Sequence, residues 1–207
     1  FVAIIATSPT VLVAYPGLKV RTMQELIASA KANPGKIRAA SAGVGSSSHL
    51  TIAMLNAAAK INLLHIPYKG AGAAILDILG GHTDLTFVVP GSVMPQIQSG
   101  QMIALALTGK KPFSGLPNVP TATEGGVTGY QASSWNGVSV PAKTPRAVVD
   151  RLYREIAAAV AQPDLQQRLR ELGIEPRAYT PEQTRELMVS DIAKWKTVIE
   201  KANIPRQ

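Results

Sequence analysis

The segment KIRAASAGVGSSSHLTIAMLNAAA, residues 36–59, decides the fold of this chain. A β-strand predicted over Lys36–Ala40 is followed by a loop of glycine and serine and then by a helix predicted over Ser47–Ala59. A second segment, LLHIPYKGAGAAILDIL, has the same order, with a strand over Leu63–Pro67, a glycine turn and a helix over Ala71–Leu79. Strands and helices that alternate over short connections are typical of βα units around a parallel sheet. The sequence therefore predicts an α/β fold.

The same alternation extends to both sides of these segments. It predicts further strands over Val11–Ala14, Leu85–Val89 and Ile103–Leu107, and helices over Thr22–Ala32 and Val93–Gln98. The composition then changes, because 13 of the first 131 residues are charged, against 21 of the last 76. This change indicates two parts of the chain.

The charged C-terminal part is predicted to consist mainly of helices. We expect helices over Pro145–Gln162, over Asp164–Leu172 and from Thr180 to about Lys201, with strands over Ser134–Val140 and Ile174–Tyr179. Three amphipathic helices need a sheet to cover, and one or two strands are too few. The sheet must be completed by Val2–Thr7, by a partner or by residues that precede Phe1.

Length and composition exclude several classes of protein. With 207 residues, 46% of them hydrophobic and 16% charged, the chain is globular and forms one large domain or two small ones. Its apolar runs stay well below the roughly 20 residues that cross a bilayer, so direct membrane insertion is not predicted. The absence of cysteine excludes disulfides, thiolate metal sites and cysteine nucleophiles. The net charge of +8 is spread over both parts and aromatic residues are only 5%, so no nucleic-acid partner is predicted.

The glycine- and serine-rich loop is a candidate anion site. The first turn of a helix leaves backbone N–H groups without partners beside the positive end of the helix dipole. A carboxylate or phosphate could be held there by neutral donors, which are these N–H groups and the serine hydroxyls. The candidate residues are Ser41, Ala42, Gly43, Gly45, Ser46, Ser47, Ser48 and His49. The alternative is an ordinary βα turn with a serine N-cap.

No cofactor and no metal site are predicted. The loop lacks the third glycine of a dinucleotide fingerprint, and no acidic residue follows where a ribose contact would need one. His49, His65 and His82 lack the spacing of metal ligands.

One enzymatic alternative stays open. Ser47 or Ser48 could act as the nucleophile of a small α/β hydrolase, and Ser47 could pair with His49 as its base. The GxSxG elbow and an evident orienting acid are missing, and residues two apart on a helix face different directions. The main prediction is therefore that the chain is not an enzyme.

A second glycine loop, Tyr68-Lys69-Gly70, follows the strand of the second segment. Lys69 offers a positive charge to an anion, and Gly70 allows a close backbone approach. Because parallel strands present their carboxyl ends at one edge of a sheet, the two loops are expected to form one site. A solvated lysine in an ordinary turn is the alternative. Trp135 is a further candidate, for lining a cleft between two lobes.

Several motifs of this sequence occur together, and in the same order, in one family. They are Ser41–His49, Pro67-Tyr-Lys-Gly70, Asp77-x-Leu-Gly-Gly81-x-x-Asp84-Leu85, Leu116-Pro-x-Val-Pro120-Thr121, Ser133-Ser134-Trp135 and Ile192-Ala-Lys-Trp195. Over essentially its whole length the chain resembles the Bug family, the TctC-like substrate-binding proteins of tripartite tricarboxylate transporters.

The resemblance implies a two-lobed, periplasmic-binding-protein-like fold with parallel-sheet βα units. Residues 1–9 and 132–207 would be the remnant of the first lobe with its crossing strands, and residues 10–131 the second α/β lobe. The resemblance further implies a periplasmic receptor without catalysis, its signal peptide removed. Such a receptor captures a small organic carboxylate and delivers it to a membrane permease of the tripartite tricarboxylate type. A carboxylate sensor that feeds a signalling partner is the alternative.

Two departures from the family's pattern affect the expected site. The family's first strand and the proline- and glycine-rich loop after it grip the ligand carboxylate, and they have no counterpart here. The first lobe is therefore expected to lack its N-terminal part. After Phe87 the family often has a polar or acidic residue, whereas this chain has Val88 and Val89. With Tyr68, these valines are expected to favour a monocarboxylate with an apolar body over a short dicarboxylate.

Overall fold

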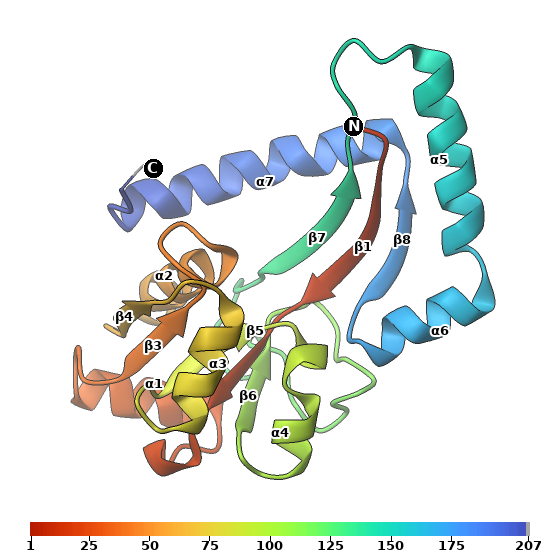
Figure 1. Ribbon diagram of the computed structural model, residues 1–207. Helices are drawn as coiled ribbons and strands as arrows, with labels where there is room; N and C mark the ends of the chain where they lie inside the picture. The colour runs from red at the N-terminus through yellow and green to blue at the C-terminus, as the bar shows by residue number, and fades with distance from the viewer. Residues whose placement is uncertain (206–207) are drawn as a thin grey trace.

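The computed structural model describes residues 1–205, which form two β-sheets and seven α-helices (Figure 1). The strands are β1 (Ala3–Pro9), β2 (Val11–Ala14), β3 (Arg38–Ser41), β4 (Leu64–Pro67), β5 (Leu85–Val88), β6 (Ile103–Leu107), β7 (Ser133–Val138) and β8 (Glu175–Tyr179). The helices are α1 (Met23–Ala32), α2 (Ser47–Ala59), α3 (Ala71–Leu79), α4 (Met94–Gln98), α5 (Arg146–Val160), α6 (Pro163–Glu171) and α7 (Pro181–Lys201). The predicted elements are present in type and order, with ends shifted by a few residues. None of these helices is both long and apolar enough to span a membrane.

The larger sheet has five strands in the order β4-β3-β5-β2-β6. Strands β4, β3 and β5 run parallel, as the alternating pattern predicts. Strand β2 lies antiparallel to both β5 and β6, so the sheet is mixed. The reason is that β2 enters this sheet directly from β1 of the other sheet, after the single residue Thr10, and not through a helical crossover.

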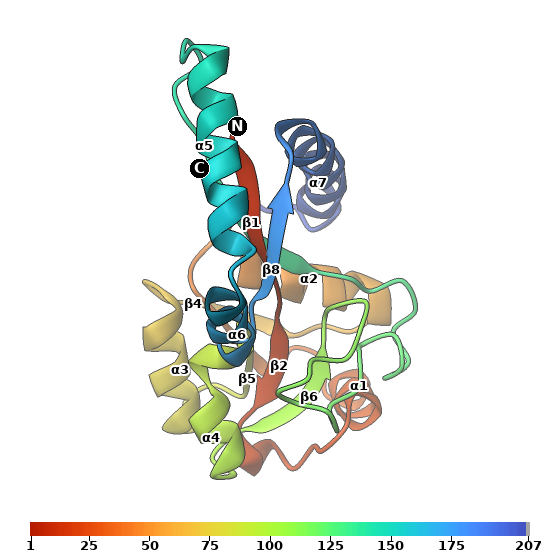
Figure 2. The same ribbon diagram turned by 90° about the vertical axis from the view of Figure 1, so that its right-hand side faces the viewer.

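Helices cover both faces of the five-stranded sheet (Figure 2). On one face α1 and α2 pack through apolar residues such as Leu26 and Leu55. On the other face α3 and α4 pack through residues such as Ile78 and Ile97. The central strands are therefore buried on both sides, and side chains are accessible mainly at the strand ends.

The smaller sheet has the strand order β7-β1-β8, with β1 antiparallel to both neighbours. The segment Val2–Thr7 thus supplies the strand that the C-terminal helices need, which is the first of the three alternatives given above. Helix α5 lies on one face of this sheet and α7 on the other (Figure 2).

Two segments cross between the sheets. The chain passes from β1 to β2 through Thr10 and returns from β6 to β7 through residues 108–132. The Thr10 N–H donates to Thr108 Oγ1 at 2.9 Å, and Thr108 Oγ1 donates to the carbonyl of Ala132. These buried bonds hold the crossing segments side by side. Helix α7 spans the molecule, and its C-terminal end contacts α2 (Figure 1).

Candidate functional site

The two glycine loops meet at the carboxyl ends of β3 and β4. The Tyr68 N–H donates to the carbonyl of Ser41 at 2.9 Å, and the Gly70 N–H donates to the carbonyl of Ala42 at 3.1 Å. Lys69 lies between these two bonds and is exposed. The expected juxtaposition of the loops at one sheet edge is therefore present.

Gly43 allows this close approach. Its φ of +132° lies in a region that side-chain-bearing residues rarely adopt. A Cβ at this position would come within 3.2 Å of the Tyr68 carbonyl oxygen. Glycine is therefore required here by both conformation and space.

Two of the loop serines hold the loop itself. Ser46 is the N-cap of α2, because its Oγ accepts from the His49 N–H at 3.3 Å, and the same Oγ donates to the carbonyl of Gly43 at 2.6 Å. Ser48 Oγ accepts from the Ala42 N–H at 3.0 Å. These two hydroxyls fix the loop before any ligand arrives.

The first turn of α2 provides the donors for an external anion. Ser47 is exposed, and its hydroxyl takes no part in the bonds that fix the loop. The N–H groups of a first helical turn have no acceptor within the helix and lie at its positive end, and because Ser46 Oγ takes the N–H of His49, the candidate donors are those of Ser47 and Ser48. An anion bound here would be held by neutral donors, with Lys69 as the nearby charge on the adjoining loop.

His49 and His65 stack beside the loop, with ring centroids 3.7 Å apart and an interplanar angle of 4°. Ser41 Oγ lies 2.6 Å from His65 Nε2, and the Gly45 N–H donates to His49 Nδ1 at 3.1 Å. Burial lowers the pKa of His49, and burial together with the neighbouring His49 lowers the pKa of His65 to about 4. Both rings are neutral at pH 7, so the loop has no imidazolium to offer an anion.

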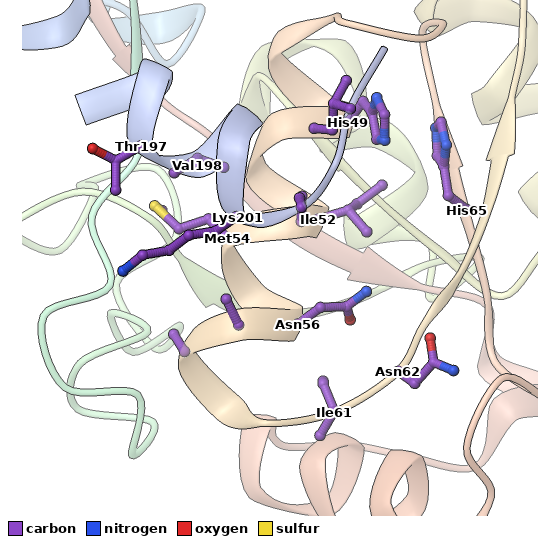
Figure 3. A pocket seen from close by; sticks show the side chains of 15 residues that line it. His49, Ile52, Met54, Asn56, Ile61, Asn62, His65, Thr197, Val198 and Lys201 are labelled. Atoms are coloured by element: carbon purple, nitrogen blue, oxygen red, sulfur yellow. The ribbon is translucent and has the colours of Figure 1, made fainter. Parts of the chain in front are cut away.

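The stacked histidines lie at the edge of a pocket of about 650 Å³ between α2 and the end of α7 (Figure 3). Apolar side chains such as Ile52 and Val198 line it, together with Asn56 and Lys201. The sequence did not predict this pocket, because its walls come from segments about 150 residues apart and no local pattern indicates that they meet.

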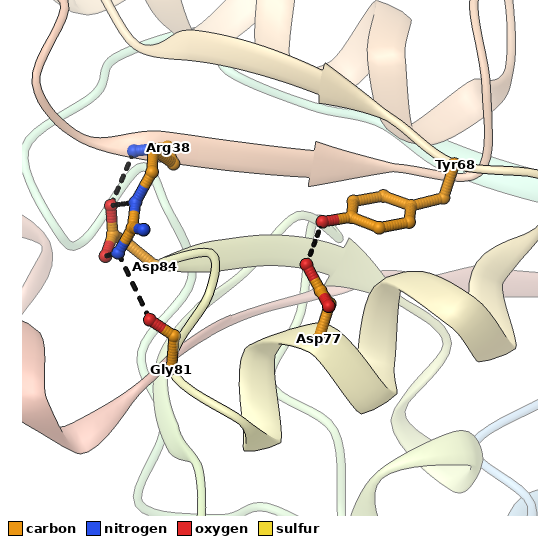
Figure 4. A network of polar contacts seen from close by, with 5 residues as sticks. All are labelled: Arg38, Tyr68, Asp77, Gly81 and Asp84. Atoms are coloured by element: carbon orange, nitrogen blue, oxygen red, sulfur yellow. Dashed lines mark hydrogen bonds and ion pairs between the residues drawn. The ribbon is translucent and has the colours of Figure 1, made fainter.

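Tyr68 is turned away from the expected ligand position. Its hydroxyl donates to Asp77 Oδ2 on α3, and its ring packs against the apolar cluster on the α3 side of the sheet (Figure 4). Val88 is only 6% exposed and belongs to the same cluster, whereas Val89 is half-buried. Core contacts therefore engage the side chains of Tyr68 and Val88, and the expected role of Tyr68, Val88 and Val89 in ligand selectivity stays a prediction.

A neighbouring ion pair explains another motif. The guanidinium of Arg38 at the start of β3 donates to Asp84 Oδ1 at 2.7 Å and to the carbonyl of Gly81 at 3.2 Å (Figure 4). Asp84 Oδ2 also accepts from the backbone N–H of Arg38 at 2.6 Å. The motif Asp77–Leu85 thus ties α3 and β5 to β3, and it positions the strands that carry the loops.

Trp135 lies elsewhere, on β7 against α7. Its Nε1 donates to Asp191 Oδ2 at 2.9 Å, and its ring lines a groove of about 490 Å³ with Ile192 and Trp195. Among residues 1–205, no side chain lines both this groove and the histidine pocket. Trp135 therefore lines a groove that is separate from the histidine pocket.

The hydrolase alternative has no support in this geometry. Ser41 is close enough to His65 for a nucleophile–base pair, but Ser41 is fully buried. The nitrogen His49 Nδ1 is occupied by the Gly45 N–H and not by a serine hydroxyl. Within residues 1–205, no hydrogen bond joins a carboxylate to either histidine, and no three His, Asp or Glu side chains are grouped to hold a metal ion.

Loops at one edge of an α/β layer, linked by two crossing segments to a second sheet, are typical of the two-lobed, periplasmic-binding-protein-like fold. The sequence matches the family described as "Tripartite tricarboxylate transporter family receptor" over residues 1–204, and the chain belongs to this family. Its fold is that of periplasmic binding proteins.

Individual relatives agree with this assignment. A UPF0065 protein encoded between tcbD and tcbE in Pseudomonas sp. (strain P51) is 38% identical, over 96% of this chain and 59% of the relative. Protein BugT of Bordetella pertussis is 34% identical, over 96% and 61%. The chain thus spans about three fifths of the length of these relatives.

Solved structures extend the comparison. The periplasmic binding protein BugD is 34% identical with a TM-score of 0.88, over 100% of this chain and 70% of that one. R. palustris Rpa4515, solved with adipate, is 30% identical with a TM-score of 0.91, over 98% and 68%. MatC from Rhodopseudomonas palustris, with bound malate, is 27% identical with a TM-score of 0.84, over 96% and 68%.

Proposed function

We propose that this chain is the solute-binding receptor of a tripartite tricarboxylate-type transporter. It captures a small organic carboxylate at the first turn of α2 and delivers it, in the periplasm, to a membrane permease. The observation that carries this proposal is the loop Ser41–His49, which two glycines and two internal serine bonds fix at the end of β3.

The chemistry of the loop suits a carboxylate. Backbone N–H groups and the Ser47 hydroxyl can donate to its oxygens, and the positive end of the 13-residue α2 favours its charge. Two relatives have been solved with the dicarboxylates adipate and malate, which supports the ligand class.

The two sheets correspond, in this proposal, to two lobes. Residues 10–131 form the lobe that carries the glycine loops, and residues 1–9 and 132–207 belong to the other lobe. The bonds between Thr10, Thr108 and Ala132 lie where the segments cross, and they would act as the pivot when the lobes close on a ligand.

The test is calorimetric titration of the chain with adipate and with malate. Replacing Ser46 and Ser47 together by Ala removes the N-cap and the exposed hydroxyl, and we expect affinity to fall by about 1–3 kcal/mol, or roughly 5- to 150-fold. Ser190→Ala on α7, also exposed, is the matched control and should leave affinity unchanged. Equal affinity of the double variant and the wild type would refute the proposed site.

A further inference from the structure

The glycine and serine loop is bonded to a histidine ring nitrogen at two places, Ser41 and Gly45. The Gly45 N–H can only donate, so His49 Nδ1 must carry a free lone pair, and a neutral His49 carries its proton on Nε2. At the other end Ser41 Oγ lies 2.6 Å from His65 Nε2. The loop is therefore held by Nδ1 of one ring and Nε2 of the other.

The surroundings keep these rings uncharged. The rings are parallel at 3.7 Å, so two positive charges there would repel each other strongly. The side chain that bonds to the pair is the neutral Ser41 of β3, whereas Lys201 of α7 lines the same pocket with its ammonium group directed away from the rings (Figure 3). No carboxylate of residues 1–205 lines this pocket.

The carboxylates of Asp77 and Asp84 have other partners. Asp77 accepts from Tyr68, and Asp84 pairs with Arg38, in the network that joins α3 to the strands (Figure 4). The lowered pKa values of both histidines agree with this picture.

We propose that His49 and His65 are a stacked, neutral pair of positioning residues that hold the ligand loop in its binding geometry, each through one specific ring nitrogen. This inference rests on the proposed function of that loop. Protonation of His49 at Nδ1 would remove the acceptor of the Gly45 N–H and release one end of the loop. Proton uptake by the pair and anion binding by the loop therefore oppose each other, although an imidazolium would by charge alone attract a carboxylate.

Amide substitutions separate this role from simple ring packing. The side-chain oxygen of Asn can take the place of histidine Nδ1, and the longer Gln side chain reaches the place of Nε2. His49→Asn and His65→Gln should keep the loop bonds, whereas His49→Gln and His65→Asn should lose them. All four variants remove one ring from the stack, so they are matched for the loss of stacking.

The tolerated substitution should differ between the two positions, with Asn tolerated at position 49 and Gln at position 65. By calorimetry at pH 7 with adipate and malate as probes, His49→Asn and His65→Gln should bind within about threefold of the wild type. His49→Gln and His65→Asn should bind at least about tenfold more weakly, a loss of about 1.4 kcal/mol. Equal losses for Asn and Gln at each position would overturn the proposal, since packing alone would then account for the effect.

A measurement without ligand keeps this inference separate from the proposed function. Hydrogen exchange of the Gly45 amide should be faster in His49→Gln than in His49→Asn, and ¹⁵N spectra should give wild-type His49 as neutral with its proton on Nε2. A proton on Nδ1 at pH 7, or equal exchange in both variants, would overturn the role of the pair. If the wild type binds neither probe, the proposed function fails, while the Gly45 exchange still decides the role of the histidines.

Discussion

At the scale of single residues, the ligand loop depends on contacts between side chains and the backbone. Ser46 and Ser48 bind loop carbonyl and N–H groups, and His49 binds the Gly45 N–H. Each bond is modest in free energy, but together they fix a segment that carries positive φ at two glycines. The geometry of the loop is thus present before a ligand binds, which reduces the cost of binding.

Gly43→Ala tests whether this geometry is required. Alanine at position 43 would have to adopt a φ of +132°. Its methyl group would lie 3.2 Å from the Tyr68 carbonyl oxygen. We expect the free energy of unfolding to fall by about 1–3 kcal/mol, measured by urea denaturation. Gly72→Ala in α3, where the methyl group meets nothing within 4 Å, should instead gain up to about 1 kcal/mol. A Gly43→Ala protein as stable as the wild type would contradict the account of the loop.

The histidine pair makes stability depend on pH. Because the pKa of His65 is lowered from 6.5 to about 4 in the folded chain, the unfolded chain binds the proton first as the pH falls. The contribution of His65 is complete above pH 6.5 and is lost between pH 6.5 and about 4. Since the ring is only partly buried, we expect a loss of about 1–3 kcal/mol.

Urea denaturation at pH 7, 6, 5 and 4 measures this loss. His65→Gln keeps a partner for Ser41 but does not titrate, so its stability should fall less between pH 6.5 and 4 than that of the wild type. Identical pH profiles for the two proteins would mean that the stability change arises elsewhere.

The residue pattern predicted the loop but not every side chain around it. Glycine spacing and the serine N-cap are local signals, so Ser41–His49 could be assigned from sequence. The direction of Tyr68 depends on Asp77, which α3 brings back to it, and the burial of Val88 depends on the central place of β5 in the sheet. The position of Trp135 depends on α7, whose contacting residues lie more than 50 positions further along the chain.

At the scale of elements, the sequence predicted the helices, the strands and the parallel arrangement of β3, β4 and β5, but not how β2 pairs. The hydrophobic period and the turn residues are patterns within about 15 residues. Whether a segment forms a helix or a strand is therefore a local property of the sequence. Strand β2 pairs with β5 and β6, more than 70 residues away, and its antiparallel direction follows from its continuity with β1. No pattern within β2 itself carries this information.

A close contact between elements of the two parts of the chain offers a test at this scale. Gly91, in the turn between β5 and α4, has no room for a Cβ because the carbonyl of Leu172 at the end of α6 occupies the space. Gly173 packs in turn against Pro90. We expect Gly91→Ala to lower the free energy of unfolding by about 1–3 kcal/mol and to speed hydrogen exchange in α6. The neighbouring exposed Ser92→Ala should change neither, and equal behaviour of the two variants would contradict this packing.

At the scale of the whole molecule, a few segments of the described residues connect the two sheets. The crossing strands, the end of α6 and the C-terminal end of α7 connect them, and α7 also closes the histidine pocket against α2. Exposed apolar side chains such as Val189 and Ile192, both 63% exposed, lie on α7. Because β2 is antiparallel to β5 and begins directly after Thr10, the crossing lies at the sheet edge where β3 ends and the ligand loop begins.

The central claim is that a carboxylate binds at the first turn of α2. Its most direct test is a titration of the ¹⁵N-labelled chain with adipate and malate, followed through the backbone amides and the Trp135 indole N–H. We predict that the largest chemical-shift changes fall on residues 43–49 and on Tyr68-Lys69-Gly70, while the Trp135 indole changes little. Saturable changes centred on Trp135 and α7, with none in the loop, would contradict the account.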